Sequence, residues 1–496
     1  MASPAGPTQG QARADEKRGR RDTQKSRRAL FSVSQSRKSP GYPTSWASRW
    51  KHRQQTPAIP RIGGGSPRCG TPTNTPLALV RQQQGLITPD DESGPEVVLP
   101  RTIQIGPEVY TLSRFYANYA TTASIVFFNQ LPDHYKSDLS EASHTRHATH
   151  AVALASAARQ LHQPGLMLEA RQHYGKAIGT LNQALRDPVR ARDDGNLVTM
   201  FLFGMFEVIV GKRSPKAIDL ENNVFPHGTG GLQLFKFRAE QGLTNEVDRG
   251  CFMFFCHAAL MEIFIQREHL TGIWSVLEEV DTPWGKGPVL EPLVRQVVDF
   301  KKAFDFKMQV QGDVSKLTAE PAEDLAELVK SGISLSNDLE AAVTLLGFSG
   351  ASSFSGQPQR VFNGLFTLSS DVSVALARSH YRCLKIFMLE RILDLKGILK
   401  EAPVKIDVEV GKMPSWSDGV AVVEEVLDDI REVFGLDGKE APADGLPYRT
   451  MTMFWPMVLV RTSCFAGPHN GRWVAERMLE LTSEAGFGLG VEAANL

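Results

Sequence analysis

The stretch WSDGVAVVEEVLDDIREVF, residues 416–434, indicates the fold class of this chain. Its apolar residues recur every three or four positions and share one face of an α-helix: Val420, Val423, Leu427, Ile430 and Phe434. Charged residues occupy the other positions, and we expect the pair Asp428-Asp429 on that solvated face. The pattern predicts a helix that buries one apolar stripe against a bundle.

The same helical periodicity repeats from about residue 97, with short breaks that contain Pro or Gly. It predicts helices over residues 110–130, 138–162, 166–186, 195–211, 228–241, 246–268, 289–312, 319–346, 370–399, 416–434, 446–464 and 471–486. Period-two alternation is confined to residues 404–410, and no repeat of fixed length emerges. The sequence therefore predicts an all-α fold over residues 97–496, a large irregular multi-helix array. The Gly- and Ser-rich residues 347–358 are expected to form a loop or a hinge between two helical halves.

Residues 1–96 differ in composition from the rest of the chain, being rich in Ser, Pro, Gly, Gln, Thr and Arg. Few large apolar residues occur there, so burial cannot offset the entropy of the chain, and we expect a disordered arm. The 496 residues include 55 Lys+Arg and 55 Asp+Glu, but the charges are segregated. Residues 1–70 hold fifteen Lys/Arg and three Asp/Glu, a net charge of +12. The rest of the chain holds 40 Lys/Arg and 52 Asp/Glu, a net charge of −12. The basic arm thus predicts attraction to a polyanion.

Two basic clusters in the arm are the candidate functional residues: Lys17, Arg18, Arg20, Arg21, Lys25, Arg27 and Arg28. Their spacing suits a nuclear import receptor or a phosphate backbone. Tyr42, Trp46 and Trp50 lie among further basic residues and could stack on bases. An inert solvated tail and a mitochondrial presequence are the alternatives, although Asp15, Glu16 and Asp22 count against a presequence. We expect a nuclear protein that makes nonspecific contact with DNA.

Motifs for catalysis, cofactors and metals are missing from the sequence. No G-x-S-x-G elbow, phosphate-binding loop or dinucleotide fingerprint occurs, so we predict neither an enzyme nor a cofactor. The five cysteines form no disulfide framework, which indicates a reduced, intracellular chain, and Cys251 and Cys256 are expected to be small core residues. The apolar runs 197–211 and 251–265 are too short to cross a bilayer, so no membrane partner is expected.

Two polar groups in the body could be mistaken for sites. His144, His147 and His150 invite a zinc hypothesis, but at about 100° per residue they spread over about 120° of a helix. An exposed polar face is the interpretation that we prefer. Asp193, Asp194 or Asn196 is expected to cap the helix that follows.

Several segments of the body, taken in order, resemble the regulatory domain of fungal-specific transcription factors. The segments are Tyr174–Leu185, then Asp194 with Phe201–Glu207, then His227–Leu234 with Arg238, then Tyr381, Arg382 and Leu384–Leu395, and finally Phe454–Met457 through Trp473 and Met478. The resemblance covers roughly residues 110–496. It implies an all-α regulatory module that supports dimers and has no catalytic residues. Its partners would be the transcription machinery, a partner transcription factor or a second copy of the chain.

Members of that family usually begin with a zinc binuclear cluster of six cysteines, whose short helix enters the major groove. In this chain only Cys69 precedes Cys251, so the cluster cannot form from these residues. Three explanations are open: an upstream exon is missing from the gene model, the protein acts through a partner, or the arm binds DNA on its own. We therefore predict a nuclear transcriptional regulator-like protein. The alternative is an all-α metabolite-binding helper or enzyme without a recognisable motif.

Overall fold

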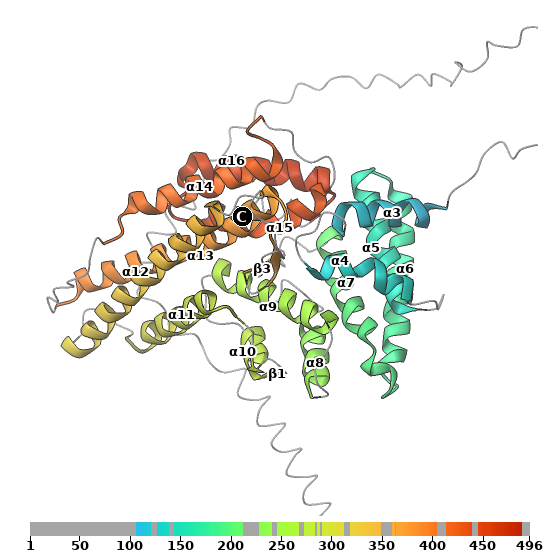
Figure 1. Ribbon diagram of the computed structural model, residues 1–496, viewed down its shortest axis with the longest axis horizontal. Coiled ribbons are helices and arrows are strands. Elements are labelled where there is room, and N and C mark those ends of the chain that lie inside the picture. The colour runs from blue at the N-terminus through green and yellow to red at the C-terminus, as the bar shows by residue number, and fades with distance from the viewer. Residues whose placement is uncertain are drawn as a thin grey trace, which may run out of the picture. The chain divides into compact units, whose positions relative to one another are not determined.

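The computed structural model describes residues 106–120, 126–137, 143–211, 228–240, 246–266, 272–282, 285–287, 290–311, 318–348, 360–362, 364–403, 413–438 and 445–488. Every described residue belongs to one compact unit, Gly94–Leu496. In the described residues the fold is all-α, as predicted, with fourteen α-helices and two short β-hairpins (Figure 1).

The elements follow in chain order. They are α3 (Pro107–Tyr119), α4 (Val126–Ser137), α5 (His144–Gln160), α6 (Pro164–Ala184), α7 (Asp194–Val210), α8 (Gly228–Ala239), α9 (Glu246–Gln266), α10 (Gly272–Glu279), β1 (Asp281–Thr282), β2 (Gly285–Lys286), α11 (Pro292–Gln311), α12 (Ala319–Phe348), β3 (Arg360–Val361), β4 (Phe366–Thr367), α13 (Asp371–Glu401), α14 (Trp416–Phe434), α15 (Leu446–Thr462) and α16 (Gly467–Ala485). A single 3₁₀ turn, η2 (Arg190–Arg192), precedes α7. Each hairpin pairs its strands antiparallel.

Helix α5 organises the N-terminal helices of the body. Ser143 caps it, because the Ser143 side chain accepts hydrogen bonds from the backbone N–H groups of Thr145 and Arg146. A three-residue turn then leads into α6, so the two helices form an antiparallel hairpin. Helices α3, α4, α7 and α16 also pack against α5. The face of α5 between α3, α4 and α6 is therefore covered by other helices.

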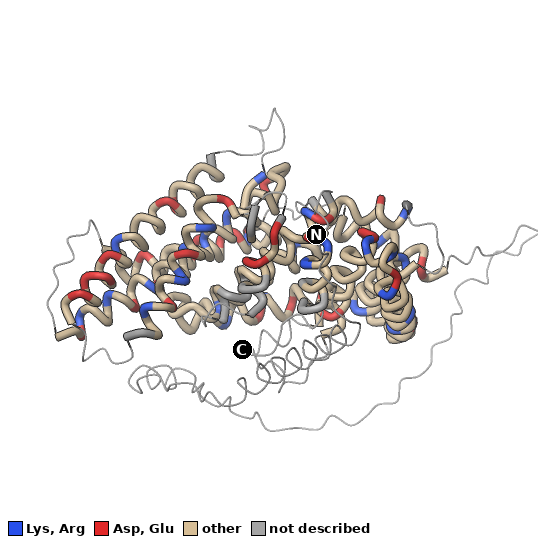
Figure 2. The backbone as a smooth tube through the Cα atoms, turned by 90° about the horizontal axis from the view of Figure 1, so that it is seen from below, with Lys and Arg blue, Asp and Glu red and all other residues tan. Residues whose placement is uncertain are grey.

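Helix α13 has the same central role among the C-terminal helices. It begins at a capping box, in which the Ser370 side chain accepts from the Ser373 N–H and the Ser373 hydroxyl accepts from the Ser370 N–H. Helices α11, α12, α14 and α15 pack around it, and α15 also contacts α3 and α9. Figure 2 shows acidic and basic residues interspersed along the described helices, as expected for amphipathic helices with solvated outer faces.

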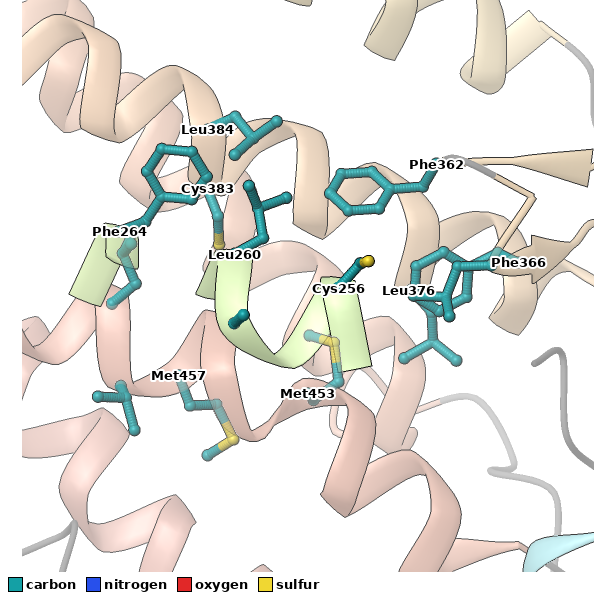
Figure 3. Close-up of a cluster of buried hydrophobic side chains, with 14 of the residues drawn as sticks. Cys256, Leu260, Phe264, Phe362, Phe366, Leu376, Cys383, Leu384, Met453 and Met457 are labelled. Carbon is teal, nitrogen blue, oxygen red and sulfur yellow. The ribbon is translucent and has the colours of Figure 1, made fainter. Parts of the chain in front are cut away.

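Helices α9, α13 and α15 and the β3–β4 hairpin contribute to one densely packed part of the core (Figure 3). Cys256 on α9 and Cys383 on α13 are buried there as free thiols, among apolar side chains such as Met453. Cys251, five residues earlier on α9, is also fully buried. The prediction that Cys251 and Cys256 are small core residues is confirmed.

The C-terminal end of α16 is hydrogen-bonded to the C-terminal ends of α5 and α7. The Gly488 N–H donates to the Ile209 carbonyl at 2.9 Å, and the Gln160 side chain donates to the Ala485 carbonyl at 3.2 Å. Gly211 ends α7 with a φ of +59°, and a Cβ on Gly211 would lie 2.1 Å from the carbonyl carbon of Gly488. The two glycines therefore allow a direct backbone contact between segments that are distant in the sequence.

The structure corrects several expected boundaries. The helix expected over 110–130 is two helices, α3 and α4, and the short helix α10 and both hairpins were not predicted. Helix α12 continues through Phe348, and the rest of the expected loop or hinge, 349–358, lies outside the described residues, as do the alternating residues 404–410. Of the three candidate caps of α7, Asp193 is the one that caps the helix, because its carboxylate accepts a hydrogen bond from the Gly195 N–H at 2.9 Å.

Replacing Gly175 with alanine is expected to raise the free energy of unfolding by about 0.5–1 kcal/mol. Gly175 lies inside α6 on an exposed face, and a Cβ there would meet no atom within 4 Å. Alanine restricts the unfolded chain and costs nothing in the helix. Urea unfolding followed by circular dichroism measures the change. A loss of stability would show that this face of α6 packs against other residues and is not exposed to solvent.

Candidate functional site

The seven basic residues selected from the sequence lie outside the described residues: Lys17, Arg18, Arg20, Arg21, Lys25, Arg27 and Arg28. The structure therefore gives them no geometry. The described helices hold one group of titratable side chains that the sequence had partly singled out. It consists of His147, His150 and His173, which we call the histidine cluster.

The α5–α6 hairpin brings the histidine cluster together. His147 and His150 are three residues apart on α5, and His173 faces them from α6, with ring centroids 5.3 Å from each. The Nδ1 atoms of His147 and His173 are 3.3 Å apart, within hydrogen-bonding distance if one of them carries the proton. The Nδ1 atom of His150 is buried and has no hydrogen-bond partner. The three rings thus form a contiguous polar group between two helices.

Helices α3 and α4 complete the surroundings of the histidine cluster. On α4, the Tyr135 hydroxyl lies 3.0 Å from His150 Nε2, and the guanidinium of Arg146 stacks 4.8 Å above the Tyr135 ring. On α3, a Glu108 carboxylate oxygen lies 3.8 Å from His173 Nε2. Four helices therefore meet at this group.

Burial is the main influence on the protonation of the three imidazoles. It lowers the pKa of His150 to about 4, and the neighbouring His173 adds to the shift. Burial also lowers the pKa of His147, and the neighbouring His173 adds to that shift. Burial lowers the pKa of His173 as well, and there Lys176 adds to the shift. All three rings are consequently neutral at neutral pH, and they can take up protons only on acidification.

The expectation of an exposed histidine face on α5 is wrong. His144 is 6% exposed and its Nδ1 lies 2.9 Å from the Thr199 hydroxyl on α7, while His147 and His150 are half-buried. Helical phase alone could not show that α4, α6 and α7 cover these positions. His257 on α9 is also buried.

Two buried ion-pair groups join other helices. Asp429 on α14 is fully buried and pairs with Arg378 and Arg382 on α13, with Arg378 Nε 2.7 Å from Asp429 Oδ1. The expected solvated position of Asp429 is therefore wrong, whereas its neighbour Asp428 is exposed. Arg238 on α8 pairs with Asp194 on α7 and with the buried Asp248 on α9. Each group fixes the relative position of helices.

Residues that carry the family resemblance lie at helix junctions. The Tyr174 ring on α6 stacks on Phe206 of α7 with centroids 4.3 Å apart. Arg238 joins α7, α8 and α9 through its two carboxylate partners. The Tyr381 hydroxyl on α13 accepts from the Phe362 N–H at 3.1 Å and hydrogen-bonds to Glu291. These contacts are those of a packed helical module.

Sequence reasoning missed His173, Asp248 and the buried role of Asp429. His173 could have been found from its position in the helix that directly follows the histidine-containing helix. Consecutive helices joined by a short turn pack against each other, so their polar residues can meet. Asp248 and Asp429 leave no such local signal, because their partners are ten and about fifty residues away.

Comparisons with known proteins identify no relative, because no family model, no curated protein and no solved structure matches the chain. Among the described residues, no group of three or more His, Cys, Asp or Glu side chains is arranged to hold a metal ion. None of the described helices combines the length and apolarity needed to cross a bilayer.

Proposed function

We propose that this protein is a nuclear, transcription-regulator-like protein in which a basic N-terminal arm provides nuclear import and attraction to DNA. The helical body would bind a partner, either the transcription machinery, another transcription factor or a second copy of the chain. One observation carries the proposal, the separation of charge into +12 over residues 1–70 and −12 over the rest. The all-α body supports it, because the regulatory domain that the sequence resembles is expected to be all-α.

Charge of this kind acts on nucleic acid without reading its sequence. Lysine and arginine side chains release counterions from the phosphate backbone, so the affinity falls steeply as salt rises. The charged residues of the described helices are interspersed in sign (Figure 2), whereas the arm concentrates one sign in a short segment. Binding to DNA through the arm should therefore be sensitive to salt and insensitive to sequence.

Neutralising the two basic clusters is expected to abolish nuclear accumulation and to weaken DNA binding. The variant replaces the seven candidate residues with glutamine in the full chain: Lys17, Arg18, Arg20, Arg21, Lys25, Arg27 and Arg28. Fluorescence anisotropy with a duplex of arbitrary sequence, measured across a salt series, gives the affinity and its salt slope. Imaging of a fluorescent fusion gives the localisation. We expect a shallower salt slope and a cytoplasmic signal.

A matched variant separates the pattern of the clusters from their charge. It replaces seven other basic residues of the arm with glutamine: Arg37, Lys38, Arg49, Lys51, Arg53, Arg61 and Arg68. DNA binding, which depends on total charge, should fall to a similar extent in both variants, whereas import should be lost only in the cluster variant. A chain that stays outside the nucleus and binds a small molecule with no dependence on salt would contradict the proposal and favour a metabolite-binding protein.

A further inference from the structure

Two buried imidazoles, those of His257 on α9 and His380 on α13, each keep a ring nitrogen that has no hydrogen-bond partner among the described residues. We propose that these nitrogens, His257 Nδ1 and His380 Nε2, bind one Cu(I) ion and thereby join α9 to α13. Such a metal site goes beyond the proposed function and does not depend on it.

The tautomer of His380 is set by its own helix. His380 Nδ1 lies 2.7 Å from the Leu376 carbonyl oxygen, and because a carbonyl oxygen can only accept, the proton lies on Nδ1. The Nε2 atom of neutral His380 therefore carries a lone pair. A histidine that binds a metal through one ring nitrogen commonly donates its other N–H to a backbone carbonyl in this way.

Both rings are buried and neutral. His257 is 8% exposed and His380 is 0% exposed. Burial lowers the pKa of His257 well below its ordinary value and the pKa of His380 to about 4, so neither ring carries a proton charge at neutral pH. A neutral imidazole can bind copper without first losing a proton. A buried polar atom without a hydrogen bond is unfavourable, and a bound ion would satisfy both nitrogens at once.

The separation of the two rings suits a shared ion. The ring centroids of His257 and His380 are 5.1 Å apart. Two imidazoles that bind one metal ion at nitrogen–metal distances of about 2.0 Å have ring centroids roughly 5–6 Å apart. The ion would therefore bind after rotation of the side chains, without a shift of α9 relative to α13.

The surroundings of the two rings favour a soft, monovalent ion. Phe362 and Phe366 of the β3–β4 hairpin contact both imidazoles, with ring centroids 4.9–6.2 Å apart. The sulfur atoms of Cys256 and Met453 lie in the same part of the core (Figure 3). Imidazole and sulfur ligands suit Cu(I), which is stable with fewer ligands than the three or four protein side chains that zinc takes. A divalent ion would cost more to bury, because the Born energy rises with the square of the charge.

The β3–β4 hairpin provides the route by which an ion reaches the rings. The Phe362 backbone has a φ of +54°, a left-handed conformation that is unfavourable for a bulky residue. The hairpin is held in place partly by the Phe362 N–H, which donates to the Tyr381 hydroxyl at 3.1 Å. Opening of the hairpin would relieve the unfavourable conformation and uncover His257 and His380.

X-ray absorption of the full chain loaded anaerobically with one equivalent of Cu(I) tests the site without any substitution. Cysteine thiols also bind Cu(I), so the measurement has to distinguish nitrogen from sulfur ligands. We expect two imidazole nitrogens at about 2.0 Å from the copper. Coordination by sulfur alone, or the absence of bound copper, would overturn the proposal.

A substitution at His257 assigns the binding to this pair of rings. His257→Leu keeps an apolar side chain against Phe362 and Phe366, and competition with a chromophoric Cu(I) chelator measures the affinity. We expect the affinity to fall on the order of 100-fold or more. His144→Gln is the matched control, because His144 is equally buried but its Nδ1 lies 2.9 Å from the Thr199 hydroxyl. Equal affinities in the two variants would exclude His257 as a ligand and overturn the proposal.

Discussion

Replacing Asp429 with alanine is expected to lower the free energy of unfolding by about 3–5 kcal/mol. The carboxylate is fully buried between α13 and α14, and its two oxygens pair with Arg378 and Arg382. The arginine side chains are only 18% and 14% exposed, and the substitution would leave them only their more exposed partners, Glu432 for Arg378 and Glu425 for Arg382. The cost comes from the charges left behind, and equilibrium unfolding in urea measures it.

The neighbouring residue provides the control for Asp429. Asp428 pairs with Arg431 on the same helix, but the Asp428 side chain is 72% exposed. Asp428→Ala should therefore change the free energy of unfolding by less than about 1 kcal/mol. Equal effects of the two substitutions would mean that Asp429 is not buried between the helices as described.

Replacing Gly211 with alanine is expected to destabilise the body by about 2–5 kcal/mol. Alanine in the left-handed conformation costs about 1–2 kcal/mol, and forcing a methyl group into a closed contact costs about 1–3 kcal/mol more. The second contribution arises because the new Cβ would lie 2.1 Å from the carbonyl carbon of Gly488. Thermal and urea unfolding measure the loss, and hydrogen exchange should place it at the ends of α5, α7 and α16.

Gly364→Ala separates the two contributions. Gly364 also has a positive φ, +78°, but a Cβ there would meet no atom within 4 Å, so only the conformational cost of about 1–2 kcal/mol applies. Gly488→Ala approaches the contact from the other side, where the new Cβ would lie 2.5 Å from Gly211 Cα. If Gly211→Ala cost no more than Gly364→Ala, the close contact between the ends of α7 and α16 would be refuted.

Apolar periodicity predicted most helices because each one buries a stripe along its own length. The face of α14 predicted from Val423, Leu427 and Ile430 is buried as expected. Periodicity failed where an element is too short to show it, as in the eight-residue α10 and the two-residue strands. It also predicted α3 and α4 as one continuous helix, because both are amphipathic and residues 108–131 contain no Pro or Gly that would mark a break.

The polar groups of the body were harder to predict because their environment comes from other helices. Asp428 and Asp429 are adjacent and chemically identical, yet only the packing of α13 makes one of them buried. His147 and His150 likewise depend on α4 and α6 for their partners. The basic clusters of the arm could be selected from the sequence, since a charge pattern needs no tertiary context, but their function has to be tested directly.

Chromatin occupancy of the full-length protein in its own cells is the measurement that tests the proposed nuclear regulatory function most directly. We predict enrichment at discrete genomic positions, selected by the partner that the helical body binds because the arm itself does not read sequence. This enrichment should be lost when the seven cluster residues between Lys17 and Arg28 are replaced with glutamine. A protein that stays in the cytoplasm, or that is nuclear but never enriched above the background of unbound chromatin, would contradict the proposed function.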